Sequence, residues 1–171
     1  MGLIHLYCGN GKGKTTAAVG LAVRCAGAGG RVIFTQFFKD GTSSELNILR
    51  TLPGVTVLAS PVKYGFFKSM SEEKRAAAGA DYTALLEKAL EKARDAELLV
   101  LDEAVSACRH GVIPEDTLLA FLDTKPEGLE VAVTGREPSE ALLERADYVT
   151  EMVKRRHPFD RGIAARRGVE F

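Results

Sequence analysis

The stretch Cys8-Gly9-Asn10-Gly11-Lys12-Gly13-Lys14-Thr15-Thr16 decides the fold of this chain. It follows a short apolar run at 3–7 that predicts a β-strand, and it precedes residues 16–26, whose apolar side chains recur at helical spacing. A strand, a glycine-rich turn and a helix that opens with Gly-Lys-Thr-Thr form the context of a phosphate-binding loop. Glycines allow successive N–H groups to point at one anion, and the start of the helix adds further donors.

Two side chains of this loop predict a role in chemistry. Lys14 would reach the outer phosphates of a nucleotide, and the Thr15 hydroxyl would complete the shell of a Mg²⁺ ion. The general pattern GxxxxGK[ST] has a glycine where this chain has Cys8, which favours the alternative of a flexible basic turn without a ligand. The flanking strand and helix, the Gly-Lys-Thr sequence and an acidic strand end favour nucleotide binding.

The acidic strand end is Leu98-Leu99-Val100-Leu101-Asp102-Glu103, an apolar run that delivers two carboxylates. Ligands of open α/β sheets bind at the carboxyl ends of the strands, which is also where a phosphate loop lies. Asp102 would hold Mg²⁺ directly or through water. Glu103 would be a further metal ligand, or a catalytic residue that orients a nucleophile. The alternative is that both are ordinary charged residues at the end of a strand.

The rest of the chain alternates between strand and helix patterns. Such alternation predicts an α/β fold of the P-loop NTPase (RecA-like) type, with three layers, a mainly parallel sheet and helices on both faces. No linker or repeat interrupts the pattern, so we expect a single nucleotide-binding domain over residues 1–171. The predicted strands are 31–38, 55–59, 131–134 and 148–150, and the predicted helices are a short one ending at 52 and those at 71–96, 116–122 and 139–145.

Composition excludes several classes of function. The chain has 171 residues, with 23 Lys and Arg balanced by 23 Asp and Glu, so no overall charge attracts nucleic acid or a membrane surface. The basic residues near the C-terminus are interpreted as a solvated surface with contacts to ligand, not as a nucleic-acid site. No apolar run is long enough to span a membrane. Three cysteines without CxxC spacing support neither a disulfide framework nor a zinc site, so we expect a cytoplasmic protein.

The end of the chain resembles a known family. Val133-Thr134-Gly135-Arg136, then residues 146–151, then His157-Pro158-Phe159-Asp160-Arg161-Gly162 resemble the P-loop class of ATP:corrinoid adenosyltransferases. The phosphate loop is similar to that family's version, in which the first position is commonly not glycine. Gln36-Phe37-Phe38-Lys39 and Leu101-Asp102-Glu103 also fall in the family's order and spacing.

This resemblance implies an activity. The enzyme would transfer the 5′-deoxyadenosyl group of ATP to the Co(I) of a corrinoid, cobalamin or cob(I)yrinic acid a,c-diamide, and release triphosphate in adenosylcobalamin biosynthesis or salvage. ATP and the corrinoid would be substrates, Mg²⁺ a cofactor, an electron-donating flavoprotein a partner, and the protein a homodimer. The resemblance places Arg24 at the phosphates and His157 near the nucleotide.

The corrinoid-facing part is expected between Tyr64 and Met70. There Phe66 and Phe67 are the candidates for filling the lower face of the corrinoid, although Lys68 stands where the family usually has tryptophan. Alternatively, both phenylalanines anchor the loop in the core. Two other functions stay open from the residues alone: a small P-loop kinase, which would release ADP, and a RecA-like regulatory module that binds ATP without turnover.

Overall fold

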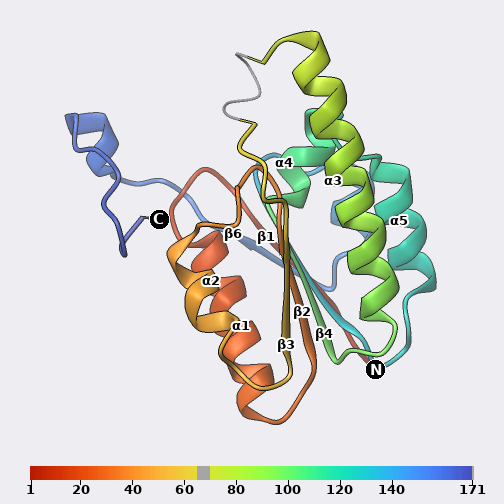
Figure 1. Cartoon of the computed structure of the whole chain (residues 1–171). Helices are drawn as coiled ribbons and strands as arrows, with labels where there is room; N and C mark the ends of the chain where they lie inside the picture. The colour runs from red at the N-terminus through yellow and green to blue at the C-terminus, as the bar shows by residue number, and fades with distance from the viewer. Residues whose placement is uncertain (65–69, 171) are drawn as a thin grey trace.

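The computed structural model describes residues 1–64 and 70–170, and within them six strands form one sheet in the order β3-β2-β4-β5-β1-β6 (Figure 1). Every neighbouring pair in this sheet is parallel, so all the carboxyl ends lie at one edge. This arrangement confirms the predicted α/β fold with a parallel sheet. The strands are β1 (Ile4–Cys8), β2 (Val32–Gln36), β3 (Val55–Ala59), β4 (Leu98–Asp102), β5 (Glu130–Thr134) and β6 (Tyr148–Glu151).

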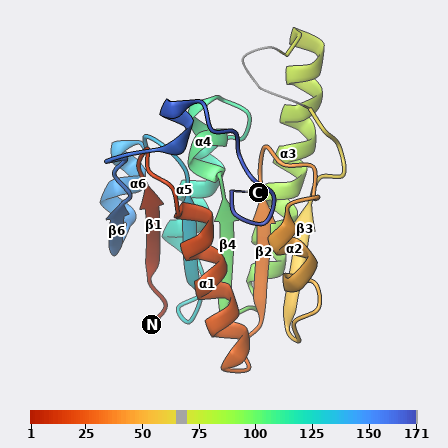
Figure 2. The same cartoon turned by 90° about the vertical axis from the view of Figure 1, so that its left-hand side faces the viewer.

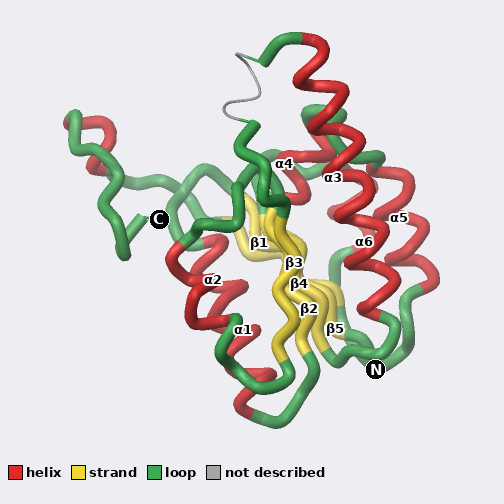
Figure 3. The backbone as a smooth tube through the Cα atoms, in the orientation of Figure 1, coloured by secondary structure: helices red, strands yellow, loops and turns green. Residues whose placement is uncertain are grey.

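Helices cover both faces of the sheet, as Figures 1 and 3 show. One core contains residues of α1 and α2 with one side of the strands, and the other contains residues of α3, α4, α5 and α6 with the opposite side. The predicted three layers are therefore present. The helices are α1 (Lys14–Gly27), α2 (Ser44–Leu49), α3 (Glu72–Ala93), α4 (Ala104–Arg109), α5 (Glu115–Thr124) and α6 (Glu140–Arg145).

Strand β4 shows why both faces must be covered. All five of its residues are buried, and its four apolar residues alternate between the two cores. Leu98 and Val100 pack with α1 and α2, whereas Leu99 and Leu101 pack in the core that contains α3. Because successive strand side chains point to opposite faces, a continuous apolar run requires helices on both sides.

Several boundaries differ from the sequence prediction. The first helix begins at Lys14, two residues before the predicted start, and its N-cap is Gly13 with a φ of 117°. The predicted helix 71–96 is α3, which runs through Gly79 without interruption, and the Ser71 side chain caps it by accepting from the Lys74 N–H. Helix α4 was not predicted, because its N-cap is Glu103 and not one of the residues preferred at that position.

The C-terminal segment follows edge strand β6, passes beside the start of α1 and extends away from the sheet on the side of α1 and α2 (Figures 1 and 2). It contains a short 3₁₀ helix, Pro158–Arg161, which the sequence analysis did not predict. None of the helices formed by the described residues has the length and apolar character needed to cross a membrane. The organisation of residues 1–171 as one domain stays a prediction.

Gly79 in the middle of α3 provides a test of the packing. Its φ is in the ordinary helical range, and a Cβ there would lie 3.5 Å from the Val112 carbonyl oxygen, an ordinary contact. Gly79→Ala should therefore raise the free energy of unfolding by about 0.5–1 kcal/mol, through the lower entropy of the unfolded chain. Urea denaturation followed by circular dichroism measures this change.

Gly2→Ala is the matched control, since a Cβ at Gly2 would lie 2.2 Å from the Leu129 carbonyl oxygen. This variant should lower the stability. A loss of stability in Gly79→Ala would contradict the described packing between α3 and Val112.

Candidate functional site

The phosphate loop is shaped by glycines that lie against the C-terminal segment. Gly9 and Gly13 have φ values of 101° and 117°, which non-glycine residues rarely adopt. A Cβ at either Gly9 or Gly11 would lie 2.6 Å from the Met152 carbonyl oxygen. That same oxygen accepts a hydrogen bond from the Gly11 N–H at 2.6 Å. Two of the glycines are therefore required by a neighbour 140 residues further along the chain, and one by backbone conformation alone.

Lys14 is the first residue of α1 and is buried, with 6% of its surface exposed. Its Nζ donates to the Gly11 carbonyl oxygen at 2.8 Å, so the side chain folds back along its own loop. Burial lowers the pKa of Lys14, the Glu103 carboxylate opposes this, and Arg136 adds to it. The ammonium group is thus held beside the loop with little water around it, where its field acts strongly on an anion.

Asp102 ends β4 at the centre of the site and is fully buried. Its Oδ1 accepts hydrogen bonds from the hydroxyls of Thr15 and Thr134, both at 2.8 Å. Its Oδ2 accepts from the Gln36 amide at 3.1 Å. Burial raises the pKa of Asp102, and the bonds from Thr134 and Thr15 counteract this rise. The structure thus places Thr15 and Asp102, both predicted as Mg²⁺ ligands, next to each other.

Gln36 was quoted only as part of a motif, and its place in the site follows from the structure. It is fully buried at the end of β2, and its Nε2 also donates to the Glu45 carboxylate at 2.7 Å. One amide thus bridges carboxylates from β4 and α2. Among the described residues, Gln36 Oε1 has no hydrogen-bond partner. A polar residue at the end of a buried strand was the signal in the sequence that could have identified it.

Glu103 follows Asp102 with a φ of 60°, a left-handed conformation that is uncommon for a residue other than glycine. Its N–H donates to the Thr134 hydroxyl at 2.9 Å, and its carboxylate accepts from the Ser106 hydroxyl at 2.7 Å. The backbone turn sends the two acidic side chains in different directions. Asp102 points into the sheet edge toward Thr15, and Glu103 points toward the first turn of α4.

Thr134 was quoted for its motif, but its role as the link between the two acidic residues follows only from the structure. Its hydroxyl donates to Asp102 and accepts from the Glu103 N–H. The hydroxyl therefore satisfies a buried charge and a backbone donor at once. Next to it, Gly135 has a φ of 150°, and a Cβ there would lie 2.8 Å from the Ser106 nitrogen.

The C-terminal segment closes one flank of the phosphate loop. The Met152 N–H donates to the Cys8 carbonyl at 2.8 Å, and the Lys154 N–H donates to Asn10 Oδ1 at 2.8 Å. Asn10 therefore uses its side chain to hold this segment. These bonds place the following residues, His157 among them, on the same side of the sheet as the loop.

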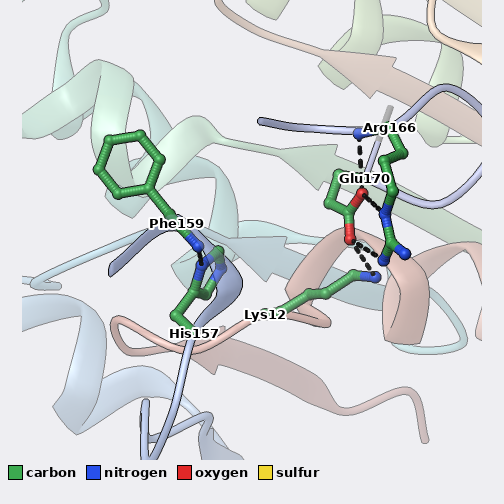
Figure 4. Close-up of polar contacts among 5 residues, drawn as sticks. All are labelled: Lys12, His157, Phe159, Arg166 and Glu170. Atoms are coloured by element: carbon green, nitrogen blue, oxygen red, sulfur yellow. Dashed lines mark hydrogen bonds and ion pairs between the residues drawn. The ribbon is translucent and has the colours of Figure 1, made fainter. Parts of the chain in front are cut away.

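His157 lies in an open hollow of about 510 Å³ that is formed by the C-terminal segment itself. Its Nδ1 accepts from the Phe159 N–H at 3.2 Å (Figure 4). Because Nδ1 is an acceptor, a neutral His157 carries its proton on Nε2 and presents a donor there. The hollow is lined by Arg155, Arg156, His157, Pro158, Asp160 and Arg161.

One predicted site residue among those described, Arg24, is not joined to this cluster. Arg24 is exposed in the last turn of α1. Ten residues separate it from Lys14, which places it about 15 Å further along the helix axis. Phe66 and Phe67 lie outside the described residues. Beside them Met70 is buried and the Tyr64 ring packs 5.6 Å from the Tyr82 ring, so both described ends of this loop are anchored on the α3 side.

Comparison with known proteins shows that the chain is similar to one family over its whole length. Residues 1–171 match the family described as ATP:corrinoid adenosyltransferase BtuR/CobO/CobP. The chain is 36% identical over 171 residues to the corrinoid adenosyltransferase of Pseudomonas aeruginosa, covering 99% of this chain and 84% of the relative. It is 34% identical over 176 residues to corrinoid adenosyltransferase CobA of Salmonella typhimurium (99% and 86%), and 31% identical over 172 residues to that of Escherichia coli K12 (99% and 86%).

Two buried threonines of the sheet, Thr134 in β5 and Thr35 in β2, provide a matched test of the network. Thr134→Val keeps the shape but removes a donor to Asp102 and the acceptor of the Glu103 N–H. The free energy of unfolding should fall by about 1–3 kcal/mol, because buried polar groups lose their partners. Chemical denaturation monitored by circular dichroism gives the value.

Thr35 is the comparison, because its buried hydroxyl has no hydrogen-bond partner among the described residues. Thr35→Val should raise the stability by about 1 kcal/mol. Equal effects of the two substitutions would show that the Thr134 hydroxyl does not hold the acidic pair.

Proposed function

The chain belongs to the family of ATP:corrinoid adenosyltransferases, and we propose that its phosphate loop and the carboxyl edge of its sheet are where the transfer takes place. The protein is thus a transferase of cobalamin metabolism whose substrates are ATP and a corrinoid. The observation that carries the placement is the contact between the Thr15 hydroxyl and the buried Asp102 carboxylate, 2.8 Å apart. It joins the loop to the acidic strand end that the chemistry of a bound triphosphate requires.

The reaction displaces triphosphate from the 5′-carbon of ATP. Co(I) of the corrinoid supplies the electron pair of the new cobalt–carbon bond, and the bond from the 5′-carbon to the phosphate oxygen breaks. The leaving triphosphate takes the electron pair of that bond, so negative charge grows on it. Loop N–H groups and the Lys14 ammonium would stabilise this charge from fixed positions, without reorganisation during the reaction.

Lys14 is suited to this role because its position is already fixed. The side chain is buried and is anchored by its bond to the Gly11 carbonyl. Burial lowers its pKa, but the nearby Glu103 carboxylate supports the charged form. We therefore propose that Glu103 contributes to catalysis chiefly by keeping Lys14 protonated, and that metal ligation is its second role.

The residues at the loop fit a Mg²⁺ ion. Thr15 and Asp102 supply oxygen atoms, which Mg²⁺ prefers as ligands. Within the described part of the chain, no group of three or more His, Cys, Asp or Glu side chains lies together. Few protein ligands are expected, since Mg²⁺ usually binds through one or two carboxylates, water and the substrate phosphates. Thr15, Asp102 and, in its second role, Glu103 would hold the ion, which would neutralise charge on the triphosphate.

The remaining contacts and partners extend this proposal. His157 would donate from Nε2 to the nucleotide, and Phe66 and Phe67 would face the corrinoid. Arg24 is proposed as a phosphate contact on the resemblance alone, because its position in α1 does not support it. A homodimer and an electron-donating flavoprotein are proposed on the same basis. A reducing cytoplasm fits the free thiols of Cys8, Cys25 and Cys108.

The products of the reaction test the function. Purified protein with Mg-ATP and chemically reduced cobalamin should form a cobalt–carbon bond, seen by absorbance, and release intact tripolyphosphate, seen by phosphorus NMR. Lys14→Ala should lower the rate about 100- to 1,000-fold, because a preorganised charge is lost from the leaving group. Lys88→Ala, on the exposed side of α3, is the control and should keep the wild-type rate.

Release of ADP would instead indicate a kinase. ATP binding with no product for any corrinoid would indicate a regulatory module, and either result would reject the proposed transfer.

The metal site has a test of its own. Asp102→Asn keeps the size of the side chain but removes the charge that would attract Mg²⁺. Calorimetry should show that Mg²⁺ no longer strengthens ATP binding to this variant, whereas ATP alone still binds. If Mg²⁺ strengthened binding to the variant as much as to the wild type, Asp102 would not be part of the metal site.

A further inference from the structure

We propose that Arg166 is a further triphosphate-binding residue, and that it exchanges the Glu170 carboxylate for the phosphates of ATP. The inference rests on the proposed nucleotide site and adds to it a residue from the end of the chain. Glu170 then acts as an internal anion that ATP must displace.

The first observation is the contact between the two residues (Figure 4). Glu170 Oε2 accepts from the Arg166 backbone N–H at 2.8 Å and from Arg166 Nε at 3.1 Å, and Oε1 accepts from Arg166 Nη2 at 2.9 Å. The guanidinium therefore donates hydrogen bonds to both carboxylate oxygens. This two-pronged geometry is the one with which arginine also binds phosphate.

The second observation is that the phosphate loop takes part in the same contact. Lys12 Nζ lies 3.5 Å from Glu170 Oε1, and Figure 4 shows both cations around the one carboxylate. Lys12 stands between Gly11 and Gly13 within the loop. Glu170 and Arg166 therefore lie directly beside the loop that would bind the triphosphate.

The third observation concerns how the end of the chain is held. Its start is fixed to the loop through Met152 and Lys154. Beyond this point the backbone turns at Gly162 and Gly168, whose φ values are 76° and 75°, and a Cβ at either glycine would meet no atom within 4 Å. Most residues from 155 to 169 are exposed. The turn that carries Glu170 can therefore move without disturbing the core.

The negative charges of Glu170 and of a triphosphate make the two compete for the same donors. Hydrogen bonds from the Arg166 side chain and backbone lower the pKa of Glu170 to about 2, so it is an anion at neutral pH. A triphosphate carries more charge than one carboxylate and offers oxygens to both Lys12 and Arg166. The carboxylate and the triphosphate cannot both use the same N–H donors, so they compete.

Competition between Glu170 and the triphosphate predicts that substitutions of Glu170 and of Arg166 change phosphate affinity in opposite directions. Glu170→Gln should tighten binding of inorganic tripolyphosphate about two- to fivefold, the range expected for one exposed ion pair. Arg166→Ala should weaken it by a similar factor, since a phosphate ligand is lost and Glu170 stays near Lys12. Isothermal titration calorimetry on the full chain, without corrinoid, gives both dissociation constants.

The double variant separates a phosphate ligand from a mere partner of Glu170. If Arg166 binds phosphate, adding Arg166→Ala to Glu170→Gln weakens tripolyphosphate binding again. If Arg166 serves only to hold Glu170, the second substitution has no effect in the absence of the carboxylate, and the inference is overturned.

Asp123→Asn is the matched control for charge. It removes one exposed carboxylate and breaks an ion pair between α5 and α6, Asp123 with Arg145, 2.7 Å long, but it does not touch Lys12 or Arg166. Its affinity for tripolyphosphate should equal that of the wild type. If its affinity rose as much as that of Glu170→Gln, the effect would come from net charge alone and the inference would be overturned. Wild-type protein that fails to bind tripolyphosphate would reject the proposed nucleotide site itself.

Discussion

The burial of one carboxylate is the constraint on which the site depends. Asp102 has no exposed surface, and an ionised group in that position is tolerated only if it is fully hydrogen-bonded. Its partners come from three separate elements: Thr15 from α1, Thr134 from β5 and Gln36 from β2. Satisfying this one charge therefore fixes the start of the helix and the ends of two strands relative to each other.

The same edge of the sheet joins the beginning of the chain to its end. The phosphate loop is continuous with β1, and β6 pairs with β1 in parallel, so the segment after β6 emerges beside the loop. The Met152 carbonyl then both accepts from Gly11 and leaves no room for a side chain at Gly9 or Gly11. Gly9 and Gly11 are therefore required by this close approach, independently of any ligand.

The cations of the site fall into two kinds with different physical properties. Lys14 is buried and fixed, which suits stabilisation of charge that develops in the transition state. Lys12 and the C-terminal arginines are exposed, and the ion pairs that they make are individually weak. A tightly held triphosphate would leave slowly. If Lys12 and Arg166 bind the Glu170 carboxylate again as the triphosphate leaves, the free-energy cost of releasing the triphosphate would be lower.

The sequence by itself determined the α/β class, the positions of the strands, and the presence of a glycine-rich loop and of an acidic strand end. These features follow from local periodicity and from spacing within a few residues. Only the tertiary structure decided that Gln36 and Thr134 complete the shell of Asp102, that Glu103 turns away, and that Glu170 meets Lys12, 158 positions away in the chain. Such contacts depend on the strand order β3-β2-β4-β5-β1-β6, because that order sets which distant residues share an edge, and no local pattern encodes it.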